Sequence, residues 1–324
     1  AKITCIGGKA RDSRLTFQEF FGRAVSEKTW GYPAAALLGS VDAQIESGCA
    51  SIGGKDSMSG TFEKINVPHT LVSFAVGHDE AKNVTSGSFK ASGNNIYMVS
   101  VPYSDLLAPD FETFLANSDV LYELNKAGKI SAMYPVQAGG IAEAVTKMAM
   151  GNMIGAEITG KIGNPCAKCG ATMKDLFIPT YGNIIVETKE DLTKAGLKDG
   201  TVTLLGKTIA DREIRVLNAA YGDVSKDVIS IPLAEVVETW EDKLKEVFPR
   251  VSGAEVQPEL PEWATKVHKS LSDVRKAPAF VQPKSSPKVL LPVFPGTNCE
   301  MDMARAFNLA GGNTKIVVLR NKTP

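Results

Sequence analysis

The segment Gly53-Gly54-Lys55-Asp56-Ser57 has the residue types best suited to chemistry in this sequence. Its glycines leave backbone N–H groups open to a ligand, its lysine supplies a positive charge, and its serine supplies a hydroxyl. These groups together suit a phosphate or a phosphorylated sugar. The spacing does not follow G-x-x-x-x-G-K-[ST], so any anion would be held differently from the phosphate of a Walker loop. A polar turn after a strand, with a solvated lysine, is an equally open interpretation.

Gly139 and Gly140 are a weaker second candidate, at the start of a helix expected over 139–153. The free N–H groups and the dipole of a helix N-terminus favour an anion. The preceding segment 134–138 contains no carboxylate, so it lacks the oxygen ligands that the magnesium ion of a nucleotide needs. Close packing of the helix is therefore the favoured interpretation of this glycine pair.

The cysteines and histidines predict neither a catalytic nor a metal-binding residue. Cys166 and Cys169 form a single CxxC, which is half of a zinc site, and no second pair or neighbouring histidine completes it. A redox pair would need a thioredoxin-like context, so two reduced thiols in a loop are the favoured interpretation. His69, His78 and His268 lie far in sequence from any nucleophile at a recognisable spacing.

The composition excludes several classes of partner. The 324 residues carry 36 Lys plus Arg and 36 Asp plus Glu, so no excess charge attracts nucleic acid or an anionic membrane. No apolar run approaches the roughly 18 residues of a membrane span. The five cysteines are an odd and sparse set, and the N-terminus lacks the pattern of a secretory signal. We therefore expect a cytoplasmic protein.

The apolar pattern predicts the elements that must position these residues. Leu37, Val41 and Ile45, four apart, indicate a helix over 33–46 that starts near Pro33. The other expected helices are 111–127, 139–153 and 300–309, and the expected strands are 49–52, 70–78, 95–101, 183–187, 202–209, 216–220, 228–231, 288–294 and 315–319. This mixed order favours a layered α/β or α+β fold.

Two stretches indicate how the chain divides. The Gly/Ser-rich segment 85–95 indicates either a tight loop or a subdomain boundary. We place the boundary near Ser92. The proline-rich segment 248–287 predicts a linker with room for a short helix at 261–274. The strand, helix and strand that follow cannot alone bury both faces of a parallel sheet, so we expect the chain to be a piece of a longer protein.

Four segments resemble phosphoribosylformylglycinamidine synthase in its large, single-chain form. They are 48–62 (GCASIGGKDSMSGTF), 139–158 (GGIAEAVTKMAMGNMIGAEI), 176–187 (LFIPTYGNIIVE) and 288–310 (KVLLPVFPGTNCEMDMARAFNLA). The first three resemble its second aminoimidazole-ribonucleotide-synthetase-like half, and the fourth resembles the start of its glutaminase domain. The resemblance implies synthetase-like subdomains at 1–92 and 93–247, a linker at 248–287, and at 288–324 the first βαβ unit of a class I glutaminase domain.

The resemblance also implies an activity for the parent protein. This family converts formylglycinamide ribonucleotide to formylglycinamidine ribonucleotide in purine biosynthesis: ATP phosphorylates the amide oxygen, and ammonia from glutamine displaces that phosphate. ATP and magnesium would serve the parent enzyme, and the partners would be the remaining synthetase half and the glutaminase domain. We expect this chain alone to be inactive, with 53–57 facing substrate or phosphate and Gly139 and Gly140 as a weaker contact.

The sequence departs from this family at two places. Many large-form members have a segment like His-Asp-Arg-Ser-Asp before the glycine pair, whereas here Pro135 and Ala138 occupy the acidic positions. Residues 177–180 (FIPT) stand where the family has a Phe-Asn-Glu-Glu-like string. The glutaminase cysteine, histidine and glutamate would lie beyond Pro324, and Cys299 is not assigned as the nucleophile. A non-catalytic scaffold half, which binds the active synthetase half and the glutaminase, remains the alternative function.

Overall fold

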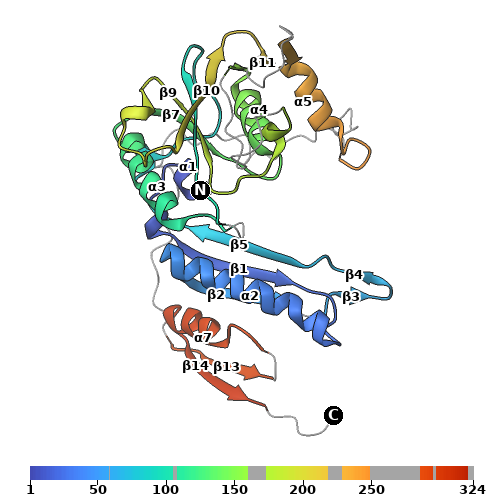
Figure 1. Ribbon diagram of the computed structural model, residues 1–324. Coiled ribbons are helices and arrows are strands. Elements are labelled where there is room, and N and C mark those ends of the chain that lie inside the picture. The colour runs from blue at the N-terminus through green and yellow to red at the C-terminus, as the bar shows by residue number, and fades with distance from the viewer. Residues whose placement is uncertain are drawn as a thin grey trace, which may run out of the picture. The chain divides into compact units, whose positions relative to one another are not determined.

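The computed structural model describes residues 1–57, 59–104, 108–159, 173–217, 228–248, 285–294 and 297–319. The chain forms two compact units, Ala1–Ser252 and Gly253–Pro324, shown in Figure 1. The expected short helix at 261–274 and the pair Cys166 and Cys169 lie outside the described residues. The subdomain limits expected from the sequence stay predictions.

A three-stranded sheet forms the first layer of unit Ala1–Ser252. Its order is β2-β1-β5, formed by β2 (Ser51–Ser57), β1 (Arg14–Phe20) and β5 (Thr70–Val76). β2 runs parallel to β1, while β5 runs antiparallel to it. The crossover from β1 to β2 is the helix α2 (Glu27–Ser47), which runs along this sheet in Figure 1. A short hairpin of β3 (Thr61–Phe62) and β4 (Ile65–Asn66) separates β2 from β5.

The helix α2 begins six residues before the expected start at Pro33. Ser26 and Thr29 form a capping box: the Ser26 side chain accepts from Thr29 N at 3.3 Å, and the Thr29 hydroxyl accepts from Ser26 N at 2.8 Å. Pro33 therefore lies inside the helix rather than in its first turn. The helix ends at Gly48, whose φ of 68° is the left-handed conformation of a C-terminal cap.

A seven-stranded sheet forms the second layer of this unit. Its order is β12-β11-β8-β10-β6-β9-β7, and its pairs are antiparallel except β8 with β11. The strands are β6 (Asn95–Val99), β7 (Ile130–Pro135), β8 (Gly155–Ile158), β9 (Ile184–Thr188), β10 (Val202–Ile209), β11 (Glu213–Leu217) and β12 (Val228–Pro232). The helices are α1 (Lys2–Cys5), α3 (Phe111–Lys126), α4 (Gly140–Asn152) and α5 (Leu233–Asp242), with 3₁₀ turns at Ala10–Asp12, Ala81–Asn83, Met173–Phe177 and Leu192–Lys194.

Both faces of this sheet are buried at its centre. Ile96 and Met98 of β6 belong to a core that includes Val145 and Met148 of α4. The alternate residue Tyr97 belongs to a second core, which includes Leu121 of α3. Because side chains alternate along a strand, one helix covers each face of β6. The helices expected over 111–127 and 139–153 are thereby confirmed as α3 and α4.

The unit Gly253–Pro324 contains one strand–helix–strand motif among its described residues. β13 (Lys288–Val293) and β14 (Asn313–Val318) pair in parallel, and α7 (Glu300–Leu309) connects them. This confirms the βαβ order expected from the sequence. Its assignment to a glutaminase domain stays a prediction. No helix in the described parts of the chain has the length and apolar character needed to cross a bilayer.

Candidate functional site

Residues 53–57 lie in the edge strand β2. They pair with β1 from Thr16↔Gly53 to Phe20↔Ser57. The interpretation of this segment as a polar turn after a strand is therefore wrong, because pairing with a strand distant in sequence outweighs the low strand propensity of two glycines. As a strand, the segment presents successive side chains to opposite faces.

The two glycines of this strand have different surroundings. A Cβ added to Gly54 would lie 2.7 Å from the carbonyl oxygen of Phe17, so only glycine permits the close approach of β1. A Cβ added to Gly53 would meet no atom within 4 Å. Gly54 thus serves the packing of the sheet, and Gly53 leaves room for a ligand beside the strand.

Lys55 has a charge that is free to bind an anion. Its Nζ donates to Ser57 Oγ at 2.8 Å and lies 5.9 Å from the centroid of the Phe20 ring. In the described part of the chain, no carboxylate oxygen lies within 4.0 Å of this nitrogen. The Ser57 hydroxyl therefore orients Lys55 without neutralising it.

A groove of 720 Å³ runs beside β2. Its lining residues are Phe17, Glu19, Leu37, Ser40, Val41, Gln44, Ser51, Gly53, Gly54, Lys55, Asp56 and Leu71. The groove thus touches four of the five residues of the first candidate segment. Glu19 and Asp56 pair across the two strands and offer acceptors for hydroxyl or amide N–H groups. The Lys55 ammonium, at Ser57 Oγ and the Phe20 ring, lies on the opposite face of β2. The strand therefore offers a positive charge on one face and acceptors on the other.

Gly139 and Gly140 do not belong to the lining of this groove. Gly139 is the N-cap of α4, and its N–H donates to Glu143 Oε2 at 2.6 Å. Lys147 Nζ lies 2.5 Å from the other oxygen of Glu143. Two hydrogen bonds lower the pKa of Glu143: the larger effect comes from Lys147 and the smaller from Gly139. A carboxylate of the chain itself therefore already interacts with this helix N-terminus.

Gly140 is packed against the turn Met173–Phe177. Its φ is +70°, and an added Cβ would lie 2.4 Å from the carbonyl oxygen of Leu176. Glycine is required here by both conformation and contact. These observations favour the packing interpretation of the pair, and a binding role for Gly139 and Gly140 stays a prediction.

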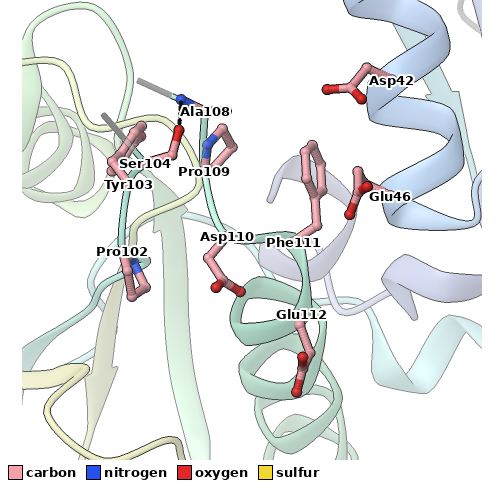
Figure 2. A pocket seen from close by; sticks show the side chains of 10 residues that line it. All are labelled: Asp42, Glu46, Pro102, Tyr103, Ser104, Ala108, Pro109, Asp110, Phe111 and Glu112. Carbon is pink, nitrogen blue, oxygen red and sulfur yellow. Dashed lines mark hydrogen bonds between the residues drawn. The ribbon is translucent and has the colours of Figure 1, made fainter. Parts of the chain in front are cut away.

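A second cavity, of 490 Å³, escaped the sequence reasoning (Figure 2). Four carboxylates line it: Asp42 and Glu46 from α2, and Asp110 and Glu112 at the start of α3. In Figure 2 the ring of Phe111 points toward the side where Asp42 and Glu46 lie. The only signal in the sequence was the spacing of Asp42 and Glu46, which lie one helical turn apart on α2.

The carboxylates of this cavity are partly committed to other contacts. Asp110 caps α3 by accepting from Thr113 N at 2.7 Å, and Glu112 lies 3.6 Å from Lys198 Nζ. Across the described residues, no three His, Cys, Asp or Glu side chains are placed so that they could hold a metal ion. We therefore assign no ligand to this cavity.

No family model matches the sequence, and no curated protein sequence matches it. Solved structures do match. T. maritima PurL complexed with AMPPCP has a TM-score of 0.55 at 12% identity, over 72% of this chain and 38% of that one. Phosphoribosylformylglycinamidine synthase II from Thermotoga maritima has a TM-score of 0.56 at 14% identity, over 80% of this chain and 42% of its own.

A hydrogenase maturation protein shares the same architecture. E. coli HypE has a TM-score of 0.50 at 12% identity, over 71% of this chain and 78% of its own. The chain has the fold of PurL and HypE. This confirms the expected aminoimidazole-ribonucleotide-synthetase-like α/β fold, and identities this low establish the fold alone. The chain spans 38–42% of the length of the T. maritima structures that it matches.

Proposed function

We propose that this chain is part of a large, single-chain phosphoribosylformylglycinamidine synthase, in which it forms the second synthetase-like half and the start of the glutaminase domain. The parent enzyme would convert formylglycinamide ribonucleotide to formylglycinamidine ribonucleotide with ATP, magnesium and glutamine. The fold shared with T. maritima PurL supports the proposal, since that protein has been solved with FGAR and with ATP. The parallel βαβ motif of β13, α7 and β14 supports the glutaminase assignment.

The observation that carries the proposal is the charge of Lys55 on the edge strand β2, which no carboxylate of the described residues neutralises. The substrate of such an enzyme carries a phosphate, and a lysine without a carboxylate partner is suited to bind it. Gly53, on the same face of the strand as Lys55, leaves space for the ligand. In this role the chain binds and orients the substrate, while the groups that perform the chemistry lie elsewhere in the parent enzyme.

The segment before α4 does not fit a magnesium nucleotide. Residues 134–138 contain no carboxylate, and the N–H of Gly139 is already bonded to Glu143. We therefore place the ATP and magnesium of the reaction in the other synthetase half. Titration of this chain with ATP and magnesium should show no tight binding, and tight binding would contradict this assignment.

Lys55→Ala tests the proposed role of this lysine. In the full-length enzyme, the variant should lower kcat/KM for formylglycinamide ribonucleotide by about tenfold or more, because a charge-assisted contact to phosphate is lost. Steady-state kinetics with varied substrate provide the measurement. Lys82→Ala is the matched control, because Lys82 is an exposed lysine that already pairs with Glu80. An unchanged kcat/KM for Lys55→Ala would contradict the proposal.

A scaffold role is the second candidate, and the exposed apolar residues of α2 favour it. Trp30, Leu37, Leu38 and Ile45 are each more than half exposed. Such a surface indicates contact with another protein surface. If this half serves only as a scaffold, Lys55→Ala leaves turnover unchanged, whereas Leu38→Asp weakens the binding of the other synthetase half.

A further inference from the structure

The groove beside β2 has apolar walls that lie open. Leu37 and Val41, one turn apart on α2, form one wall, and Phe17 of β1 and Leu71 of β5 line the groove from the sheet. Leu37 is 60% exposed, Val41 42% and Leu71 38%. Exposed apolar side chains that gather on one concave surface indicate contact with another chain segment. Within the described residues, no segment covers these side chains.

Two carboxylates without a cation lie in the same groove. Glu19 of β1 pairs directly with Asp56 of β2, and both side chains line the groove. In the described part of the chain, no Lys, Arg or His nitrogen lies within 4.0 Å of either carboxylate. Like charges directly opposite each other on paired strands repel. A positive charge placed between them would remove this repulsion.

Lys55 does not supply this charge, although it is the neighbour of Asp56 in the sequence. Side chains alternate along a strand, so these two residues point to opposite faces of β2. The Lys55 ammonium lies at Ser57 Oγ and over the Phe20 ring. A compensating cation therefore has to come from another segment that enters the groove.

We propose that this groove is the docking surface of an amphipathic helix from the part of the parent protein outside this chain. A helix suits it because sheet faces in α/β layers are covered by helices. Apolar side chains of the helix, three or four residues apart, pack between Leu37, Val41 and Leu71. One Lys or Arg of the helix extends its apolar stem along these residues and places its charge at Glu19 and Asp56. This inference rests on the proposed function only in taking the chain as part of a longer protein.

Carboxyl labelling of the full-length protein tests this docking surface. A water-soluble carbodiimide couples glycine ethyl ester to accessible carboxylates, and mass spectrometry gives the rate at each residue. Asp56 and Asp199 are both exposed in this chain, and Asp199 lies outside the groove. Under a docked helix, Asp56 should be labelled about tenfold or more slowly than Asp199, because the reagent reaches it only when the helix opens. Equal rates at the two aspartates would overturn the proposal.

Two substitutions show which groups hold the helix. Leu37→Asn removes an apolar contact, and Glu19→Gln removes one of the two carboxylates. In the full-length protein, each should speed the labelling of Asp56 by about fivefold or more. Leu244→Asn and Glu63→Gln are the matched controls, because both residues are exposed and lie outside the groove, and they should leave this rate within about twofold. Protection of Asp56 that neither test variant reduces would overturn the proposal.

Dilution distinguishes a helix of the same polypeptide from a second copy of the protein. An intramolecular helix should protect Asp56 equally after about hundredfold dilution. Loss of protection on dilution would show that a second copy fills the groove, and would overturn the proposal. Fast labelling of Asp56 would leave the substrate role of Lys55 intact, because Lys55 lies on the opposite face of β2. Conversely, an unchanged kcat/KM for Lys55→Ala with a protected Asp56 would refute the proposed substrate contact and support the docked helix.

Discussion

Gly140→Ala is expected to destabilise the chain by roughly 2–5 kcal/mol. A left-handed backbone costs a residue with a Cβ roughly 1–2 kcal/mol, and overpacking against fixed atoms costs roughly 1–3 kcal/mol more. Both costs apply here, because φ is +70° and the added Cβ would lie 2.4 Å from Leu176 O, an atom of the backbone. Urea unfolding, followed by circular dichroism, measures the change in the free energy of unfolding.

Gly128→Ala separates these two costs. Gly128 has the same φ of +70°, but an added Cβ would meet no atom within 4 Å. This variant should therefore lose only about 1 kcal/mol. Equal losses at Gly128 and Gly140 would show that the packing of Gly140 against the turn Met173–Phe177 has no energetic weight.

Glu187→Ala should destabilise the chain by about 3–5 kcal/mol. The Glu187 side chain is fully buried, and its oxygens accept from Lys90 N at 2.8 Å, Ala91 N at 3.2 Å and Asn94 Nδ2 at 2.7 Å. Removal of the carboxylate leaves three donors without this acceptor, and each buried unsatisfied donor costs about 1–3 kcal/mol. Thermal and urea unfolding of the purified variant provide the measurement.

Glu190→Ala is the matched control for Glu187, because Glu190 is an exposed glutamate shortly after the same strand. Its substitution should change the free energy of unfolding by no more than about 0.5 kcal/mol. A loss below about 1 kcal/mol for Glu187→Ala would mean that water replaces the carboxylate, and that Glu187 does not hold segment 90–94 to the sheet.

The elements predicted well from the sequence are those with strong local signals. Asp110 caps α3, and the apolar spacing of α4 matches the core face on which Val145 and Met148 lie. β10 (Val202–Ile209) and β5 were also predicted within two residues, because each is an apolar run between turn residues. In these segments local preference and tertiary packing agree.

The elements that were missed depend on partners distant in sequence. β1, with residues Arg14–Phe20, mixes polar and apolar side chains and is never fully buried, so its composition alone gives a weak strand signal. Residues 53–57 contain two glycines that oppose a strand, yet pairing with β1 extends β2 through them. β7, β8 and α5 were likewise not predicted, since long-range pairing fixes the two strands and long-range packing fixes the helix.

The candidate site was predicted as a segment but not as a cavity. The residue types of 53–57 indicated an anion site, whereas the helix α2 that forms another wall of the groove could not be placed beside them from the sequence. Gln44 reaches Ser51 only because α2 folds back over β2. For Gly140, the contact with Leu176 supports the favoured packing interpretation. This contact joins residues distant in sequence, so no local pattern could predict it.

We propose that this chain works as part of a glutamine-dependent synthase and not by itself. The most direct measurement compares the full-length protein with this chain alone, each supplied with formylglycinamide ribonucleotide, ATP, magnesium and glutamine. We predict that the full-length protein releases the amidine product and ADP, and that the chain alone releases neither. Amidine formation by the isolated chain, or none by the full-length protein, would contradict the account.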